Sequence, residues 1–183
     1  MVYAAEHPGT IGAIVLVGCG TFDKASRDVA VQVRRKKILD YIAGHPEYKA
    51  DLNMDIDQQM MKWHDMTDAY ESLPYERKSA AAEPFDVRGH AETWEDMLRC
   101  QEAKLYPQSF TAVKTPAIML HGRHDPHPGA MIRDNLRQFI PQLEYREFDR
   151  CGHDPVMEKH ARDEFLAVTK DWLRSKFTGT REA

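Results

Sequence analysis

A short apolar stretch that ends in a cluster of ionisable side chains constrains this chain more than any other feature. Residues 116–120 are apolar, and the polar turn that follows places Asp125 directly after His124. An apolar run of this length indicates a buried strand. In open α/β sheets, ligands bind outside the carboxyl ends of the strands. The turn around Asp125 is therefore a candidate functional site.

A second expected strand also leads into an ionisable turn. Residues 144–148 predict this strand, and His153 follows it in a Cys-Gly-His turn. We expect a helix over about 130–139 between the two strands. A last helix should run from an N-cap at Asp154 to about Phe177. Alternating strands and helices predict a parallel sheet with right-handed crossovers.

The beginning of the chain adds a third strand. Residues 1–7 read as the last turns of a helix that Pro8 ends. The stretch 11–18 is apolar on both faces, which is typical of a buried parallel strand. We expect residues 1–23 to start an α/β core that residues 108–183 complete.

Residues 24–107 separate the two parts of the expected core and contain no strand-like run. Apolar residues at helical spacing predict a helix that Ser26 caps and that reaches about residue 42. Further helices are expected over about 55–73 and 91–104, and the segment 74–84 receives no assignment. We interpret this stretch as an all-helical cap inserted into the core.

Composition excludes several classes of protein. The net charge of −4 gives no electrostatic reason to bind nucleic acid or an anionic membrane. No apolar run approaches the roughly 20 residues of a membrane span, and the first residues do not resemble a signal peptide. The three cysteines are far apart and odd in number, which favours free thiols. We expect a cytoplasmic protein without cofactor, nucleic-acid partner or membrane partner.

The order of these elements resembles the C-terminal half of the α/β-hydrolases. The matching motifs are Gly122-Arg-His-Asp125 after one strand and Gly152-His153 after the next. The opening residues 3–17 are similar to the helix and strand that follow the nucleophile in this family. Helical caps before the acid-bearing strand are common there. The resemblance covers nearly the whole chain and implies an α/β protein with a partial α/β-hydrolase fold: three parallel strands, flanking helices and a helical cap.

The resemblance also implies a triad in the chain order nucleophile, acid, histidine. His153 would be the general base, and Asp125 would bind its other ring nitrogen and fix its tautomer. The nucleophile of the family lies in a G-x-S-x-G turn, and this chain has no such turn. Its five serines lie in other contexts: Ser26, Ser72, Ser79, Ser109 and Ser175.

We therefore expect the truncated, C-terminal portion of a hydrolase that acts on an ester or related acyl bond of a small molecule. The alternative origin is a gene start placed at an internal methionine. Without a nucleophile we expect no activity from this chain alone, so whether it is itself an enzyme stays open. One alternative is an epoxide hydrolase- or dehalogenase-type enzyme with an upstream Asp nucleophile. Another is a non-catalytic binding module that keeps Asp125 and His153 as relics.

Other conspicuous residues have simpler interpretations. Cys151 lies on the same turn as His153 and is interpreted as a partly buried thiol. The histidines at 121, 124 and 127 recur every third residue, but a turn makes their directions diverge and no Cys or Glu completes a ligand set, so no metal is expected.

The expected cap contains four methionines that could line an acyl pocket, although packing inside the cap is the simpler interpretation: Met54, Met60, Met61 and Met66. Trp94 is expected to pack within the cap. The basic run 34–37 is expected to be a solvated helix face. The strand at 11–17 should expose an apolar edge, which predicts self-association.

Overall fold

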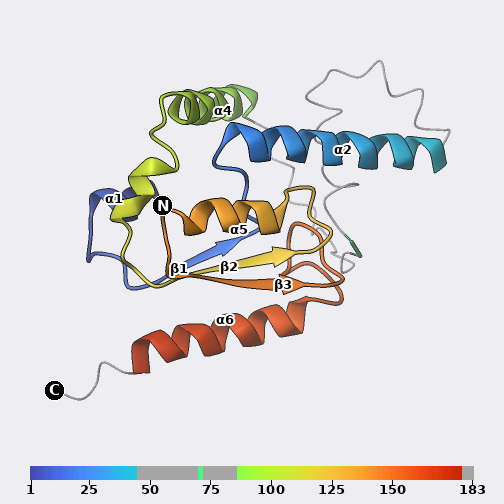
Figure 1. Cartoon of the computed structure of the whole chain (residues 1–183). Helices are drawn as coiled ribbons and strands as arrows, with labels where there is room; N and C mark the ends of the chain where they lie inside the picture. The colour runs from blue at the N-terminus through green and yellow to red at the C-terminus, as the bar shows by residue number, and fades with distance from the viewer. Residues whose placement is uncertain (45–69, 72–85, 179–183) are drawn as a thin grey trace.

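A computed structural model of the chain describes residues 1–44, 70–71 and 86–178 (Figure 1). The elements in chain order are α1 (Val2–Glu6), β1 (Ile14–Val17), α2 (Lys24–Gly44), α4 (Val87–Glu102), the 3-10 helix η2 (Gln108–Ala112), β2 (Ala117–Gly122), α5 (Gly129–Arg137), β3 (Leu143–Phe148) and α6 (Arg162–Phe177).

The three strands form one parallel sheet in the order β1-β2-β3. Ala117 at the start of β2 lies opposite Ile14 on one side and Leu143 on the other. All six residues of β2 are buried. The prediction of three neighbouring parallel strands is confirmed, and the central strand is apolar because both of its faces are covered.

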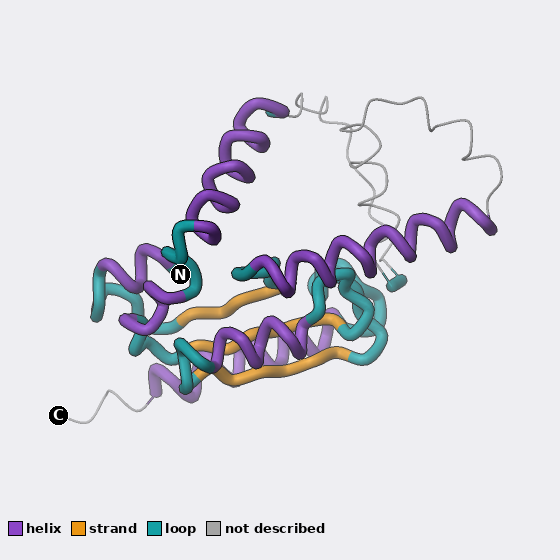
Figure 2. Tube along the Cα trace, turned by 45° about the horizontal axis from the view of Figure 1, so that its top comes forward, coloured by secondary structure: helices purple, strands orange, loops and turns teal. Residues whose placement is uncertain are grey.

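Helices cover both faces of the sheet. The helices α1 and α5 lie on one face and α6 lies on the other, while α2 and α4 lie farther out on the side of α5 (Figures 1 and 2). Successive side chains of β2 point to opposite faces, so Met119 packs into the core beneath α5 with Leu136. Leu120 packs into the core above α6 with Trp172. Packing on both faces holds the sheet in place between α5 and α6, so the ends of its strands have fixed positions.

Two strand boundaries differ from the sequence expectation. Pairing of β1 starts only at Ile14, whose N–H donates to the Pro116 carbonyl oxygen at 2.9 Å, because Pro116 itself has no N–H to offer. The strand β2 continues past Leu120 to Gly122, which pairs with Phe148. His121 is therefore part of the central strand.

Two helix starts also differ. Asp23 caps α2, because its carboxylate accepts the Ser26 N–H at 2.9 Å and the Ser26 hydroxyl at 2.7 Å. The prediction of Ser26 as the cap was wrong. The last helix begins at Arg162 and not near Pro155, because the residues between them form turns.

Several expectations fall on the insertion between β1 and β2. The helix expected over 55–73 lies outside the described residues apart from its last part, 70–71, which is a bend and not helix. The unassigned segment and the four methionines also lie outside them. The described residues between β1 and β2 contain the helices α2, α4 and η2 and no strand. The division into 1–23, 24–107 and 108–183 stays a prediction.

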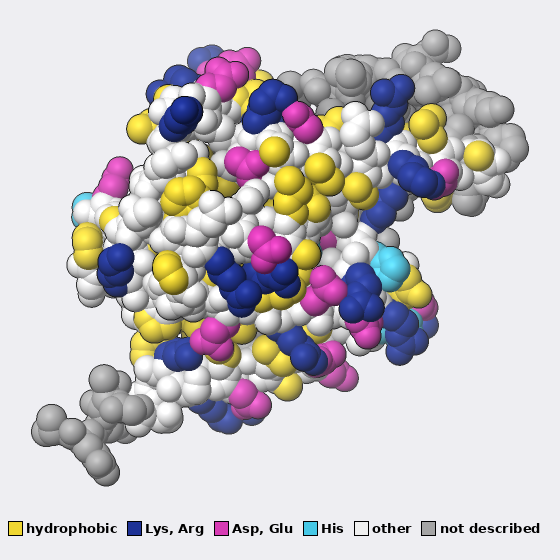
Figure 3. All heavy atoms as spheres, viewed as in Figure 1, with side chains coloured by type: hydrophobic (Ala, Val, Ile, Leu, Met, Phe, Trp, Pro, Cys, Tyr) yellow, Lys and Arg dark blue, Asp and Glu magenta, His cyan; other side chains and the backbone are white. Residues whose placement is uncertain are grey.

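Two surface expectations are corrected. Trp94 is 49% exposed and lines a pocket, so it is not buried cap packing. Within the basic run, Arg35 and Lys36 are exposed, but the Lys37 ammonium donates a hydrogen bond to the His124 carbonyl oxygen. On the face shown in Figure 3, basic and acidic side chains are interspersed. None of the described helices has the length and apolar character needed to cross a membrane.

The strand β1 is an edge strand within the described part of the chain. It pairs with β2 on one side, and no described strand pairs with its other side. Its four residues carry no charge, and Val17 is 41% exposed. An uncharged edge with unpaired backbone groups is a template for another strand.

We propose that β1 pairs with β1 of a second copy of the chain. Val17→Lys should weaken this association, because a charged side chain on an edge strand opposes strand addition. Sedimentation velocity at several concentrations measures the effect. Val31→Lys, which changes an exposed residue of α2, is the matched control and should leave the association unchanged. A monomeric wild type with a sharp, cooperative melt would contradict the proposal.

Candidate active site

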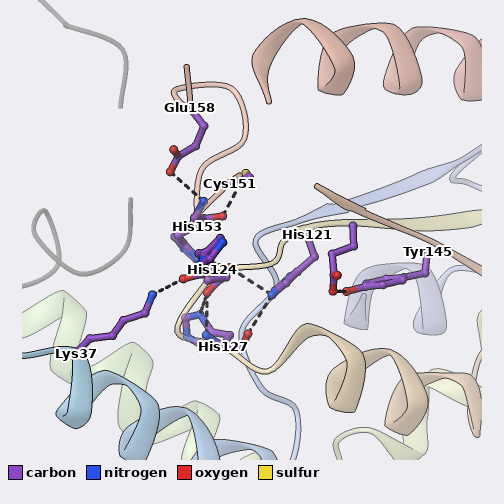
Figure 4. A network of polar contacts seen from close by, with 11 residues as sticks. Lys37, His121, His124, His127, Tyr145, Cys151, His153 and Glu158 are labelled. Carbon is purple, nitrogen blue, oxygen red and sulfur yellow. Dashed lines mark hydrogen bonds and ion pairs between the residues drawn. The ribbon is translucent and has the colours of Figure 1, made fainter. Parts of the chain in front are cut away.

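Asp125 and His153 meet beyond the carboxyl ends of β2 and β3. The ring Nδ1 of His153 lies 2.9 Å from the Asp125 Oδ2, in hydrogen-bond contact (Figure 4). The two residues are far apart in the sequence, and the parallel pairing of β2 with β3 brings their turns to the same edge of the sheet. The structure thus joins both residues that the sequence singled out.

Direct backbone contact holds the two turns together. The His124 N–H donates to the Cys151 carbonyl oxygen at 2.8 Å. A Cβ on Gly122 would lie 2.0 Å from the Gly152 carbonyl oxygen, so only glycine allows this approach. The glycines of the two short motifs therefore have a steric role at the contact between the turns.

The end of β1 forms a third wall of the site. Gly18 has a φ of +53°, and a Cβ there would lie 2.4 Å from the His153 carbonyl oxygen. An L side chain would be strained in this conformation and would also collide with the histidine turn. All three strands therefore contribute their carboxyl ends to the site.

His127 is a site residue that the sequence analysis did not select. Its backbone N–H and its ring Nδ1 both lie 2.8 Å from the Asp125 Oδ1. The His153 ring binds the other oxygen, Oδ2, so each oxygen of the carboxylate binds one imidazole. The centroids of the two rings lie 5.2 Å apart. An Asp side chain that accepts a hydrogen bond from the backbone N–H two residues later forms a common turn. The Asp-Pro-His sequence at 125–127 was the feature that could have predicted this turn.

The three histidines of the turn diverge only in part. His124 is exposed and its ring packs on Tyr70 at 4.5 Å between centroids. His121 is buried, with Nε2 3.1 Å from the His127 carbonyl oxygen and 3.4 Å from the Asp125 Oδ2. Two of the three therefore contact Asp125, which the sequence analysis did not foresee.

The Asp125 carboxylate is ionised at neutral pH. Its side chain is 0% exposed, and burial alone would raise its pKa. Hydrogen bonds from His127 and His153, together with the nearby His121, outweigh burial and lower the pKa well below its usual range. Burial lowers the pKa of His121, and Asp125 offsets only part of this effect. His121 is thus a neutral ring whose Nε2–H donates to the His127 carbonyl oxygen.

Two thiols near the site are buried and protonated at neutral pH. Burial is the main cause that raises the pKa of Cys19 and of Cys151 to about 12, with Asp125 adding to the effect at both. A neutral thiol is a poor nucleophile because the thiolate is the reactive form. Cys151 was expected to be a partly buried thiol, and the structure buries it fully.

Two serine hydroxyls have other partners. Ser26 is buried and donates to the Asp23 Oδ2 at 2.7 Å. Ser175 donates to the Trp172 carbonyl oxygen at 2.7 Å near the end of α6. Ser72 and Ser79 lie outside the described residues. Ser109 is exposed on η2, which precedes the amino end of β2, whereas Asp125 and His153 follow the carboxyl ends of β2 and β3. The described part of the chain thus leaves the nucleophile unassigned.

Asp125, His127 and His153 are also the group of described residues that could hold a metal ion. Their candidate ligand atoms lie within 4.8 Å of one another. One carboxylate with two imidazoles suits zinc or iron(II). However, both ring Nδ1 atoms already lie in hydrogen-bond contact with the carboxylate. A hydrogen-bonded acid with two imidazoles accounts for the same convergence.

A pocket of about 280 Å³ opens beside His127. Its lining comes from the loop after β1, from α4 and from the Asp125 turn: Gly20, Thr21, His90, Thr93, Trp94, Met97 and His127. Gln101 ties α4 to this loop, because its Nε2 donates to the Thr21 carbonyl oxygen at 3.0 Å. The insertion thus forms one wall of a pocket next to the acid.

No protein-family model matches this chain, and no curated protein matches it. Among solved structures it is similar to VinJ, with 16% identity and a TM-score of 0.58 over 95% of this chain and 61% of that chain. It is similar to the proline iminopeptidase of Mycobacterium smegmatis, with 14% identity and a TM-score of 0.55 over 94% and 60%. A thermostable carboxyl esterase from Bacillus coagulans matches with 13% identity and a TM-score of 0.50 over 94% and 59%.

These neighbours are enzymes of the α/β-hydrolase fold, and this chain has that fold in part. The resemblance inferred from the motifs is confirmed at the level of the fold. The chain spans about 61% of the length of VinJ and similar shares of the others. At these identities the likeness is one of fold, so the chemistry must come from the site itself.

Asp125→Asn should lower the free energy of unfolding at pH 7 by about 1–3 kcal/mol, because a neutral amide offers one acceptor oxygen to several buried donors. The folded-state pKa of Asp125 is depressed, so its stabilisation is present above the unfolded pKa of about 3.9 and is lost as the pH falls below it. Urea unfolding of both proteins should show the difference shrinking between about pH 5 and pH 2.

Asp134→Asn is the control for this experiment. Asp134 is an exposed carboxylate on α5 that pairs with Arg133, and exposed pairs contribute little. A stability difference between wild type and Asp125→Asn that stays constant over this pH range would contradict the assignment of Asp125 as a buried, ionised acid.

Proposed function

We propose that Asp125 and His153 are the acid and the general base of a hydrolase that cleaves an ester or related acyl bond in a small molecule. The observation that supports this proposal is the 2.9 Å contact between the His153 Nδ1 and the Asp125 Oδ2. An ionised carboxylate can only accept hydrogen bonds. The His153 Nδ1 therefore carries the proton, and its Nε2 keeps a lone pair for catalysis.

The proton transfers follow from this tautomer. The Nε2 of His153 takes the proton of the nucleophile as the nucleophile adds to the acyl carbon. The same nitrogen then donates that proton to the leaving alkoxide, and Asp125 stabilises the imidazolium in between. Water deacylates the intermediate by the same two transfers and regenerates the nucleophile.

Two features of the environment support this role for Asp125. The carboxylate is buried and ionised, so its attraction for an imidazolium is weakly screened. His127 binds the second carboxylate oxygen and fixes the plane of the acid. Both features prepare the site for a positive charge on His153 before any substrate binds.

The pocket beside His127 is the proposed site of the acyl group. Trp94 and Met97 give it an apolar wall, while Thr21 and His90 add a few polar groups. Such a mixture is typical of small-molecule sites. Residues 24–107 would then act as the cap that selects the substrate.

The nucleophile is the missing part of the proposal. The chain has no G-x-S-x-G turn, so we propose that residues preceding this sequence in a longer protein supply the nucleophile. An aspartate of the epoxide hydrolase or dehalogenase type would use the same acid and base. The three buried, free cysteines support a reducing compartment such as the cytoplasm.

The chain alone should hydrolyse p-nitrophenyl acetate no faster than its His153→Ala variant. The protein encoded by the reading frame extended upstream should turn it over, and His153→Ala should reduce kcat/KM about 10²–10⁴-fold. Turnover by the present chain that is lost in His153→Ala would overturn the proposed location of the nucleophile.

A fluorophosphonate probe distinguishes the two nucleophiles, because it labels an activated serine and not an aspartate. Labelling of the extended protein that depends on His153 would support the serine enzyme. An upstream frame without a serine or aspartate at a strand-to-helix turn would contradict the hydrolase proposal and favour a non-catalytic module.

A further inference from the structure

Glu158 is a buried carboxylate in a stretch that was expected to be a helix. It follows the histidine turn and precedes α6, and it is only 1% exposed. Burying a carboxylate is costly unless hydrogen bonds replace its water. Its partners therefore show what this residue holds in place.

Three backbone N–H groups surround this carboxylate. The Glu158 Oε1 accepts from the Gly152 N–H at 3.0 Å and from the Tyr70 N–H at 2.9 Å. The Oε2 accepts from the Glu71 N–H at 2.9 Å. Figure 4 shows Glu158 pointing at the turn that carries His153. One side chain thus joins the histidine turn to a segment of the insertion.

Further contacts strengthen the same junction. The Lys159 N–H donates to the Glu71 carbonyl oxygen at 2.9 Å. The Glu71 side chain, which is 47% exposed, pairs with Lys159 at 2.5 Å and with His160 at 2.7 Å. Exposed ion pairs contribute little, whereas hydrogen bonds to a buried charge are strong. The Glu158 carboxylate therefore contributes more than the exposed ion pairs to holding residues 70–71 against the histidine turn.

Tyr70 and Glu71, which Glu158 holds, also lie near the turn around Asp125. The Tyr70 ring packs on the ring of His124, which directly precedes Asp125. Tyr70 thus contacts the acid turn directly and reaches the histidine turn through Glu158. Neither Tyr70 nor Glu71 is among the residues that line the pocket beside α4.

We propose that Glu158 is a positioning residue that couples docking of the insertion at Tyr70 and Glu71 to the alignment of His153 with Asp125. The Gly152 N–H belongs to the Cys151–Gly152 peptide, which lies one residue before His153, and Glu158 holds this peptide on its N–H side. The His124 N–H holds the carbonyl side of the same peptide. Without Glu158 the histidine turn loses one of these two anchors, and the ring loses its fixed aim at the carboxylate. The catalytic meaning rests on the proposed function, but the coupling does not.

The chain contains an internal control for this coupling. His127 binds the same carboxylate through its own Nδ1, yet it belongs to the acid turn, and Glu158 has no hydrogen bond to that turn among those described. Loss of Glu158 should therefore disturb the ring of His153 and spare the ring of His127. General loosening of the site would disturb both rings.

The test compares Glu158→Gln with Glu71→Gln. Glutamine has a neutral oxygen at one position and an NH₂ group at the other. It therefore loses the N–H donors that face the NH₂ group and weakens the bonds that its oxygen keeps, because the negative charge is gone. Glu71→Gln weakens the exposed ion pairs but keeps the Glu71 backbone N–H. The readouts are amide hydrogen exchange and ¹⁵N NMR of the histidine rings, neither of which requires turnover. Failure of the hydrolase proposal would therefore leave this test intact.

In Glu158→Gln the amides of Gly152, Tyr70 and Glu71 should exchange about tenfold faster or more. The His153 ring should shift from the Nδ1–H tautomer toward a mixture, while the His127 ring and the β2 amides stay unchanged. Glu71→Gln should leave all these signals as in the wild type. Equal changes in both histidine rings, or equal effects of the two variants, would overturn the proposal.

Glu158→Asp covers the case in which Glu158→Gln does not fold. It keeps the charge and both acceptor oxygens but shortens the side chain by one methylene group. Partial loss of Gly152 protection together with a partial shift of the His153 tautomer would support the coupling. Fast exchange at Gly152 with an unchanged His153 ring would overturn it.

Discussion

The buried, ionised carboxylate of Asp125 is the interaction on which the rest of the site depends. An uncompensated charge in a protein interior is very costly, so the surrounding structure must supply donors in fixed positions. His153 and His127 each bind one of its oxygens, and the His127 backbone N–H adds a further bond. The orientation of the His153 ring thus follows from the hydrogen bonds that the buried charge of Asp125 requires.

The parallel sheet makes that arrangement possible. Because β2 and β3 run in the same direction, their following turns lie at one edge of the sheet. Gly122 lets the turns touch, and Gly18 lets the end of β1 pass against His153. Larger residues at these glycines would push the turns of Asp125 and His153 apart.

A second buried carboxylate, Glu158, organises the other side of the site. Asp125 binds the rings of His127 and His153, whereas the partners of Glu158 in the described part of the chain are backbone N–H groups of two distant segments. The carboxylates of Asp125 and Glu158 therefore have different structural roles. Asp125 sets the electrostatics of the His153 ring, and Glu158 holds the Cys151–Gly152 peptide one residue before that histidine.

The sequence by itself determined the type and order of the elements. The apolar runs at β1 and β2 predicted buried parallel strands, and the Asp and Gly-His turns predicted the pair at 125 and 153. These features are local, because neighbouring residues indicate whether a strand is buried and which turn follows it. The pattern predicted a parallel α/β sheet, and the resemblance of its motifs to a known family added the partial α/β-hydrolase fold.

Only the tertiary structure decided which further residues join the site. The His127 ring turns toward Asp125 and adds a second hydrogen bond to the Oδ1 that already accepts the His127 backbone N–H. The last helix starts at Arg162, and Glu158 before it is buried against residues 70–71 and Gly152. The contacts of Glu158 with residues 70–71 join segments far apart in the chain. The His127 contact is local, but the direction of its ring was set only by the folded turn. Local propensity at Asp154 and Pro155 favoured a helix, and long-range hydrogen bonds to a buried charge outweighed it.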